Sequence, residues 1–224
     1  MLFSAIRHLP ALECLRLTNH DGPIRTFPGV GQFSKLQSAT LTRIRSPLVE
    51  GAAGDSLQLA GLPALRELVL AVVHDFERPV ILMADTFTAM GGLTHLALRS
   101  VPPHTLHIQL QPDSLRGLSA LQRLELVGCG LTEIPAALAA VGQTLHSLDV
   151  SRNSGLQLTA AAHDMLLAMP QLRTLNVQKL SDDVQEAACS WTDRSVMFLM
   201  RLGVGHCARY RGRPPLDIVW TEAG

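Results

Sequence analysis

The sequence predicts an α/β solenoid, with a curved parallel β-sheet on the concave side and short helices and extended segments on the convex side. Three observations support this fold class. A six-residue leucine motif recurs at intervals of 24 to 29 residues, another apolar residue precedes most copies at a constant distance, and leucine supplies 39 of the 224 residues. Aromatic residues are only 4% of the chain, which suits a core of stacked small side chains rather than a β-sandwich.

The motif has the form Leu-x-x-Leu-x-Leu, and seven copies share one register. Two copies end in valine, at Val150 and Val177, and one has Ala39 at its fourth position. A single copy has too few neighbours to bury its own leucines, so consecutive copies must stack on one another. The first leucines of the copies are Leu12, Leu36, Leu65, Leu93, Leu121, Leu145 and Leu172.

The periodicity extends upstream of the motif. In the sixth copy, Val141 stands four positions before Leu145, which indicates one extra residue in that repeat. In the other copies an apolar residue stands three positions before the first leucine, at Leu9, Phe33, Leu62, Met90, Leu118 and Met169. Agreement over this distance is specific to a repeat array, whereas one isolated motif would carry no information.

This pattern resembles the leucine-rich-repeat family, whose consensus continues as Leu-x-x-Leu-x-Leu-x-x-Asn/Cys-x-Leu. The fifth copy follows the consensus from Leu121 to Leu131, with Cys129 at the Asn/Cys position, and the sixth copy supplies Asn153. The resemblance covers about residues 6–180. It implies that Cys129 and Asn153 form hydrogen bonds with loop backbone between coils. The other five copies lack Asn or Cys there, which predicts irregular loops.

Each of about seven repeats should contain one strand and one return segment. Alternation along the strand directs motif positions four and six inward and positions three, five and seven outward. Residues 85–90 and 159–168 predict short helices in the return segments. Residues 106–110 alternate and follow two prolines, so they predict an extended segment.

The repeat pattern stops after residue 180, so we expect a repeat array over 1–180 and a C-terminal cap over 181–224. Apolar residues at helical spacing over 184–202 predict a helix. A basic loop should follow over 203–213, and the alternating run at 214–220 predicts a final strand.

Composition excludes several functional classes. The formal net charge is zero, with 19 basic and 19 acidic residues, which argues against nucleic-acid binding. No apolar run is long enough for a membrane span, and the N-terminus lacks the features of a secretory signal. The four cysteines show no metal-ligand spacing, so free thiols and a cytoplasmic location are predicted, with a Cys189–Cys207 disulfide as the alternative.

Nothing in the sequence indicates catalysis. No nucleophile stands at a fixed offset from His95, His146 or His163, and His104 and His107 have no further ligands at metal spacing. The glycine-containing stretches do not match phosphate-binding loops. The sequence therefore predicts neither an enzyme nor a cofactor or metal site.

The outward positions of the strands are the candidate binding residues. Arginine is frequent among the residues that dominate protein interfaces, so Arg99 and Arg123 are expected at the centre of the site. Arg99, Arg123, Glu125 and Asp149 should form one compact patch bordered by His95. The full set of predicted partner-binding residues is Arg16, His95, Arg99, Arg123, Glu125, Asp149 and Asn176.

These features predict a non-enzymatic scaffold that binds a protein partner through the concave face. No polar cap precedes Ile6, so an upstream domain or a neighbouring subunit is expected against the first coil. Two alternatives remain open. One is the substrate-recognition part of an F-box-type ubiquitin ligase whose F-box is absent from this chain, since the Val219-Trp220 ending is similar to the closing strand of some such proteins. The other is a secreted or effector recognition module.

Overall fold

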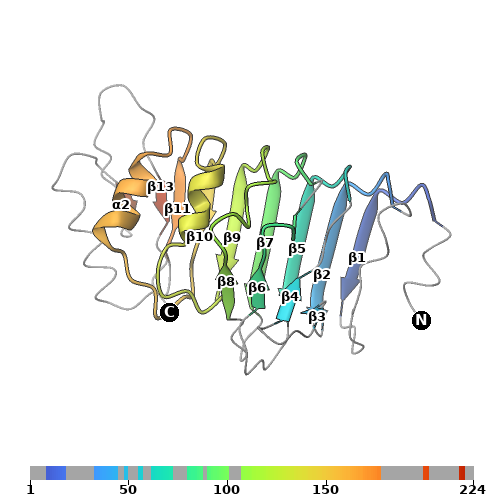
Figure 1. Ribbon diagram of the computed structural model, residues 1–224, viewed down its shortest axis with the longest axis horizontal. Coiled ribbons are helices and arrows are strands. Elements are labelled where there is room, and N and C mark those ends of the chain that lie inside the picture. The colour runs from blue at the N-terminus through green and yellow to red at the C-terminus, as the bar shows by residue number, and fades with distance from the viewer. Residues whose placement is uncertain are drawn as a thin grey trace.

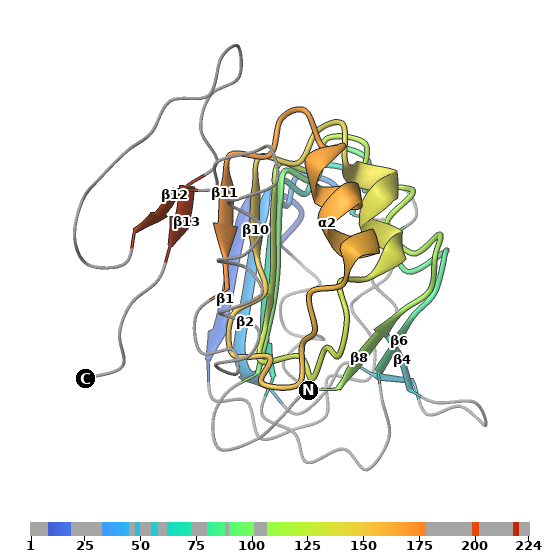
Figure 2. The ribbon, with the colours of Figure 1, turned by 90° about the vertical axis from the view of Figure 1, so that its left-hand side faces the viewer.

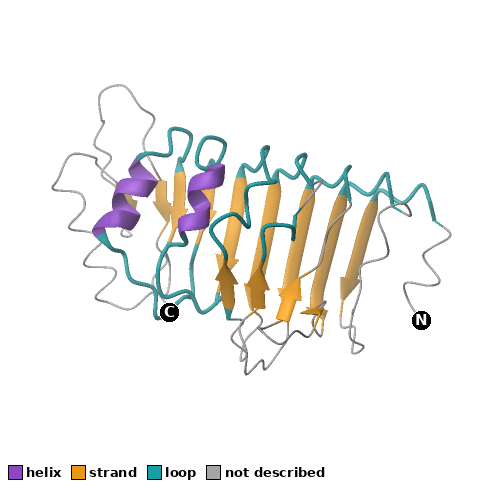
Figure 3. Cartoon of the chain, viewed as in Figure 1, coloured by secondary structure: helices purple, strands orange, loops and turns teal. Residues whose placement is uncertain are grey.

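The structure is a computed structural model that describes residues 9–18, 33–44, 48–49, 55–57, 62–72, 80–87, 90–100, 107–177, 199–201 and 217–219. These residues form a solenoid with two sides (Figures 1 and 2). A large parallel sheet forms one side. A smaller sheet and two short helices form the other, with the helices toward the C-terminal half (Figure 3). The predicted solenoid architecture is therefore confirmed.

The large sheet has nine strands in the order β1-β2-β5-β7-β9-β10-β11-β13-β12, and all its neighbouring strands are parallel. Its strands are β1 (Cys14–Thr18), β2 (Ser38–Ile44), β5 (Glu67–Val72), β7 (His95–Ser100), β9 (Arg123–Val127), β10 (Ser147–Asp149), β11 (Thr174–Asn176), β13 (Asp217–Val219) and β12 (Leu199–Arg201). In this sheet, the strands from β1 through β11 in the order just given coincide with the copies of the leucine motif.

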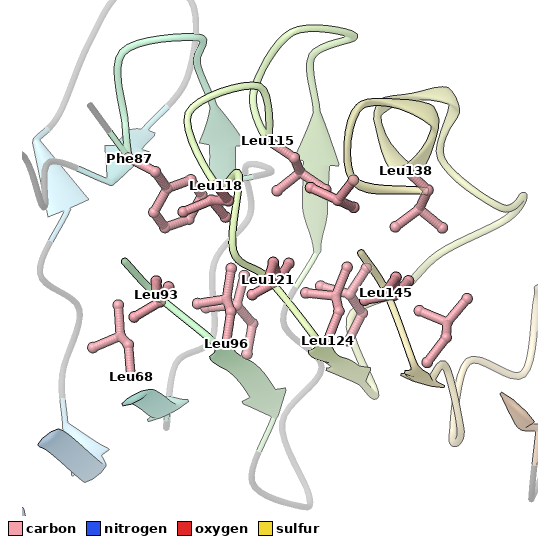
Figure 4. Close-up of a cluster of buried hydrophobic side chains, with 14 of the residues drawn as sticks. Leu68, Phe87, Leu93, Leu96, Leu115, Leu118, Leu121, Leu124, Leu138 and Leu145 are labelled. Carbon is pink, nitrogen blue, oxygen red and sulfur yellow. The ribbon is translucent and has the colours of Figure 1, made fainter. Parts of the chain in front are cut away.

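Strand register places identical motif positions side by side. Leu96, for example, pairs with Leu68 on β5 and Leu124 on β9. The predicted column at motif position four is present and buried, and it consists of Leu15, Ala39, Leu68, Leu96, Leu124, Leu148 and Leu175. Figure 4 shows Leu68, Leu96 and Leu124 of this column on one side of the core and Phe87, Leu115, Leu118 and Leu138 on the other.

A repeated backbone contact holds the coils at this spacing. The carbonyl oxygen at motif position two accepts two N–H groups from the next coil: Thr94 O accepts from Gln122 N at 2.9 Å and from Arg123 N at 3.0 Å. The carbonyls that accept in the same way belong to Glu13, Gln37, Arg66, Gln122 and His146. Because these bonds involve only backbone atoms, side chains outside the leucine positions are free to vary from coil to coil.

The turn before each strand also repeats. Leu121 N donates to Leu118 O at 3.1 Å, which joins the first leucine of the motif to the apolar residue three positions earlier. In the sixth copy, Leu145 N donates instead to Val141 O, four positions earlier, at 3.0 Å. The extra residue predicted for this repeat is thus accommodated by one wider turn.

The return segments contain a four-stranded sheet in the order β3-β4-β6-β8, in which only β3 and β4 are antiparallel. Two helices follow, a 3₁₀-helix η1 (Ala136–Val141) and α2 (Ala160–Leu167), and α2 confirms the helix predicted over 159–168. The extended prediction at 106–110 is confirmed by β8. The strands of this sheet are β3 (Leu48–Val49), β4 (Asp55–Leu57), β6 (Val80–Leu82) and β8 (Ile108–Leu110).

The helix predicted over 85–90 is wrong in its described part, where residues 84–87 form a turn. Met83 N donates to Thr86 Oγ1 at 2.9 Å, and Thr86 N donates back to Met83 O at 3.1 Å. These two bonds close a single turn between Met83 and Thr86.

Asn153 and Cys129 play the part implied by the resemblance. Both are buried. Asn153 Nδ2 donates to Leu126 O at 2.8 Å in the preceding coil, and its Oδ1 accepts from Leu131 N at 3.1 Å. The Cys129 thiol donates to Leu98 O at 3.3 Å, again one coil back. These side chains bind the backbone near the ends of β7 and β9, and Asn153 also binds the loop that follows β9.

Gly130 is required by the same loop. Its φ is +65°, and a Cβ atom there would lie 2.4 Å from Nδ1 of His107. A side chain at this position would therefore meet both backbone strain and a direct clash.

The C-terminal prediction is partly corrected. Strand β13 lies within the run 214–220 that predicted a strand. Residues 199–201 form strand β12 and not the end of a helix, since Met200 is paired in parallel with Ile218 of β13. The rest of the helix predicted over 184–202 lies outside the described residues. The cap over 181–224 and the number of complete repeats therefore stay predictions.

Leu124→Ala tests the buried column. Leu124 is fully buried between Leu96 and Leu148, so its truncation should leave a cavity in the middle of the array. We expect a loss of about 2–5 kcal/mol in the free energy of unfolding, measured by urea denaturation. Gln122→Ala, at an exposed position two residues earlier, is the matched control and should change stability little. Equal stabilities of the two variants would contradict the stacked core.

Thiol labelling tests the loop contact of Cys129. Burial raises the pKa of the Cys129 thiol, and the nearby charge of Asp149 raises it further. Cys14 is exposed. Iodoacetamide at mildly alkaline pH should alkylate Cys14 in the folded protein and reach Cys129 only after denaturant is added, as read by peptide mass spectrometry. Equal labelling rates at the two sites in the folded protein would contradict this packing.

Candidate interaction site

The face of the large sheet that points away from the return segments carries motif positions three, five and seven. We call it the open face, and it is the face predicted to be concave. Figure 2 shows the sheet on one side of the molecule with α2, β6 and β8 on the other. On β1 the predicted alternation is confirmed, because Leu15 is buried whereas Cys14, Arg16 and Thr18 are not.

Position five departs from the prediction on the central strands. Val69, Ala97 and Glu125 occupy this position on β5, β7 and β9, and all three are buried although they were expected to face solvent. Ala97 and Glu125 are register partners. His95 and Arg99, on either side of Ala97, both reach across to Glu125. The alanine methyl group is small enough to lie beneath them.

The Glu125 carboxylate is the centre of an ionic cluster. Its Oε1 forms an ion pair with Arg123 Nε at 2.9 Å and lies 3.1 Å from His95 Nε2. Its Oε2 accepts from Arg99 Nε at 2.7 Å and also from Arg99 Nη2. Three side chains thus contact this one carboxylate, and both of its oxygens are engaged.

The protonation state of Glu125 follows from these contacts. Burial acts to raise the pKa of this carboxyl, but hydrogen bonds from His95 and Arg99 and the positive charges of Arg99 and Arg123 outweigh it and lower the pKa to about 2. The group is accordingly a carboxylate at neutral pH. Its side chain is only 3% exposed, whereas those of Arg99 and Arg123 are 43% and 58% exposed. The negative charge thus lies beneath two positive ones.

Two further residues, Glu67 and Ser38, join the cluster. His95 Nδ1 lies 3.2 Å from Glu67 Oε1, and Ser38 Oγ donates to Glu67 Oε2 at 3.1 Å. Neither was among the predicted site residues. Ser38, Glu67, His95 and Arg123 all hold motif position three and are consecutive register partners. Aligning that position across strands would have found both missing residues.

Only part of the predicted central patch comes together, and Asp149 is bound elsewhere. His95, Arg99, Arg123 and Glu125 come together in one contact network. Asp149 is the register partner of Glu125, but its Oδ2 accepts from Asn176 Nδ2 and its Oδ1 from the Ser151 backbone N–H, both at 2.9 Å. Arg16 lies on β1, two strands beyond Glu67 in the sheet order.

The order of contacts does not match a hydrolytic triad. Such a triad places the imidazole between the hydroxyl and the carboxylate, where it can take the hydroxyl proton. Here Glu67 lies between Ser38 and His95, so His95 is not positioned to activate Ser38. In the described part of the chain, no three His, Cys, Asp or Glu side chains gather as a metal site, and no helix is long and apolar enough to cross a membrane.

Glu125→Gln tests the ionic cluster through the pH dependence of stability. The pKa of about 2 lies below the ordinary value of 4.5 for a glutamate carboxyl group. The ionised Glu125 therefore stabilises the folded state fully above about pH 4.5, and this contribution is lost as pH falls toward 2. It amounts to about 3 kcal/mol.

Urea denaturation between about pH 6 and pH 2 should show the variant less stable at pH 6 and the two stability curves converging in acid. The other carboxyl groups are the same in both proteins, so their contributions cancel in the difference between the two unfolding free energies. Parallel curves over this range would contradict the role assigned to Glu125.

Comparison with known proteins agrees with this architecture at a coarse level. No family model matches the sequence. The chain is 28% identical over 127 residues to vasorin from Mus musculus, a protein that contains leucine-rich repeats. The match covers 53% of this chain and 18% of vasorin, so the chain spans less than a fifth of that relative. The parallel solenoid and this likeness together fit a protein-interaction module of the leucine-rich-repeat type.

Proposed function

We propose that this chain is a non-enzymatic interaction module, without cofactor or metal, that binds a protein partner through the open face of the large sheet. The observation that carries the proposal is the ionic cluster around Glu125. It fixes two half-exposed arginines at the centre of a sheet whose neighbouring open-face positions are mostly short side chains. Arginines held in this way are frequent among the residues that dominate protein interfaces.

Stability alone does not account for this cluster. Burying a carboxylate has a large desolvation cost, and apolar residues of similar size often replace buried ion pairs without loss of stability. Val69 and Ala97 hold the equivalent position on β5 and β7 and are apolar. Asp149 holds that position on β10, but it is only partly buried, whereas Glu125 is buried. Glu125 is thus a buried charge in a row where β5 and β7 bury apolar residues, which supports a role for the groups that it orients.

The strands also give the site rigidity. His95, Arg99 and Arg123 project from adjacent hydrogen-bonded strands, and each contacts the same carboxylate. Side chains placed on strands and fixed by neighbouring hydrogen bonds lose less conformational freedom on binding than loop residues do.

The test is affinity capture on the immobilised full chain with quantitative mass spectrometry. We expect the double variant Arg99→Ala/Arg123→Ala to lose the partners that the wild-type chain retains. The matched control is Arg116→Ala/Arg173→Ala, which removes the same charge from exposed positions outside the cluster. It should retain them.

The rival site is the N-terminal coil, where Leu9 is half exposed. Ile6, predicted to lie in that coil, is outside the described residues, and Ile6→Glu probes it. If Ile6→Glu abolishes capture without unfolding the chain while the Arg99→Ala/Arg123→Ala variant captures as the wild type does, the open face is not the binding surface.

A further inference from the structure

We infer that the partner presents an acidic side chain, the carboxylate of an Asp or a Glu, to Arg99 and Arg123. This inference rests on the proposed function and specifies the chemistry of the partner. Its basis is the set of guanidinium N–H groups that the Glu125 carboxylate leaves unused and the charges that surround them.

Both arginines have guanidinium N–H groups that do not contact Glu125. Arg123 contacts Glu125 through Nε, and Arg99 contacts it through Nε and Nη2. Within the described part of the chain, both terminal nitrogens of Arg123 and Nη1 of Arg99 have no acceptor. A guanidinium is planar and presents its N–H groups in a fixed fork that matches a carboxylate. The free ends of the two side chains therefore form a ready receptor for one.

The charge presented to solvent is positive. Glu125 carries one negative charge beneath two positive ones, and it is almost fully covered, whereas about half of each arginine side chain is exposed. The trio has a net charge of +1, and the positive ends are the part that a partner meets. Since Glu125 already orients both guanidinium groups, binding a further anion costs little additional side-chain entropy.

The surroundings favour a single carboxylate over an extended polyanion. Glu67, 45% exposed, lies on the β5 side of the arginines, and Asp149 lies on the β10 side. A nucleic-acid strand would bring several phosphates and place some of them against these carboxylates, where like charges repel. One acidic side chain on a protein segment fits between the flanking acids.

The test begins with a phage-displayed library of random twelve-residue peptides. The library is selected on the immobilised wild-type chain and depleted on the Arg99→Ala/Arg123→Ala variant. We expect the surviving peptides to share an Asp or Glu. For a synthetic peptide of this set, replacing that acidic residue by its amide (Asp→Asn or Glu→Gln) should weaken binding to the wild-type chain roughly tenfold, measured by fluorescence anisotropy.

A double-mutant cycle then assigns the contact. The same amide substitution should change binding to the Arg99→Ala/Arg123→Ala variant less than about twofold, because the partner of the carboxylate has gone. The Arg116→Ala/Arg173→Ala control should keep the full preference for the acidic peptide. An amide substitution that is equally costly on all three proteins would overturn the inference.

Ser147→Trp separates failure of this inference from failure of the proposed function. Ser147 is the register partner of Arg123, so a bulky side chain there obstructs the open face. Peptides that lack acidic residues yet are blocked by Ser147→Trp would overturn the inference and leave the proposed function standing. A selection in which no peptide is sensitive to Ser147→Trp would overturn both.

A single-stranded oligonucleotide tests the preference for one carboxylate over a polyanion. If it binds the chain as tightly as the acidic peptide does at about 150 mM salt, the carboxylate assignment is overturned.

Discussion

The register between parallel strands is the constraint on which the rest of this structure depends. It is maintained by the carbonyl at motif position two, which binds two N–H groups of the next coil, and by the parallel pairing that follows. A slip by one residue would turn the leucine columns out to solvent and the charged rows into the core. The free energy of burying the leucines therefore determines which polar side chains meet on the open face.

The ionic cluster is a direct consequence of this register. His95 and Arg99 lie on one strand, Arg123 and Glu125 on the next, and the residues joined across the strands are 26 to 30 positions apart in the chain. Their proximity comes from the repeat length and not from local sequence. Ala97, between His95 and Arg99, is buried and is the register partner of Glu125, so a small side chain occupies the position across which both groups reach.

Burial and nearby charges act in opposite directions on the pKa of Glu125. Desolvation opposes ionisation of Glu125, whereas two arginines and a histidine favour it, and the lowered pKa shows that the favourable contacts dominate. The result is a fixed, deeply placed anion that orients two partly exposed cations. Such an arrangement limits the motion of the arginines while leaving part of their hydrogen-bonding capacity open to a partner.

The solenoid, the motif strands of the large sheet, the wide turn of the sixth repeat and the contacts of Cys129 and Asn153 all followed from the pattern of residues, because each depends on a spacing that recurs along the chain. The burial of Glu125, the extension of the cluster to Glu67 and Ser38 and the pairing of Asp149 with Asn176 emerged only from the folded structure. The reason is physical. Periodicity specifies which face a residue occupies, but the reach of a side chain across that face depends on the size and charge of neighbours in other coils. The turn at 84–87 is a local feature instead, closed by hydrogen bonds between Met83 and Thr86.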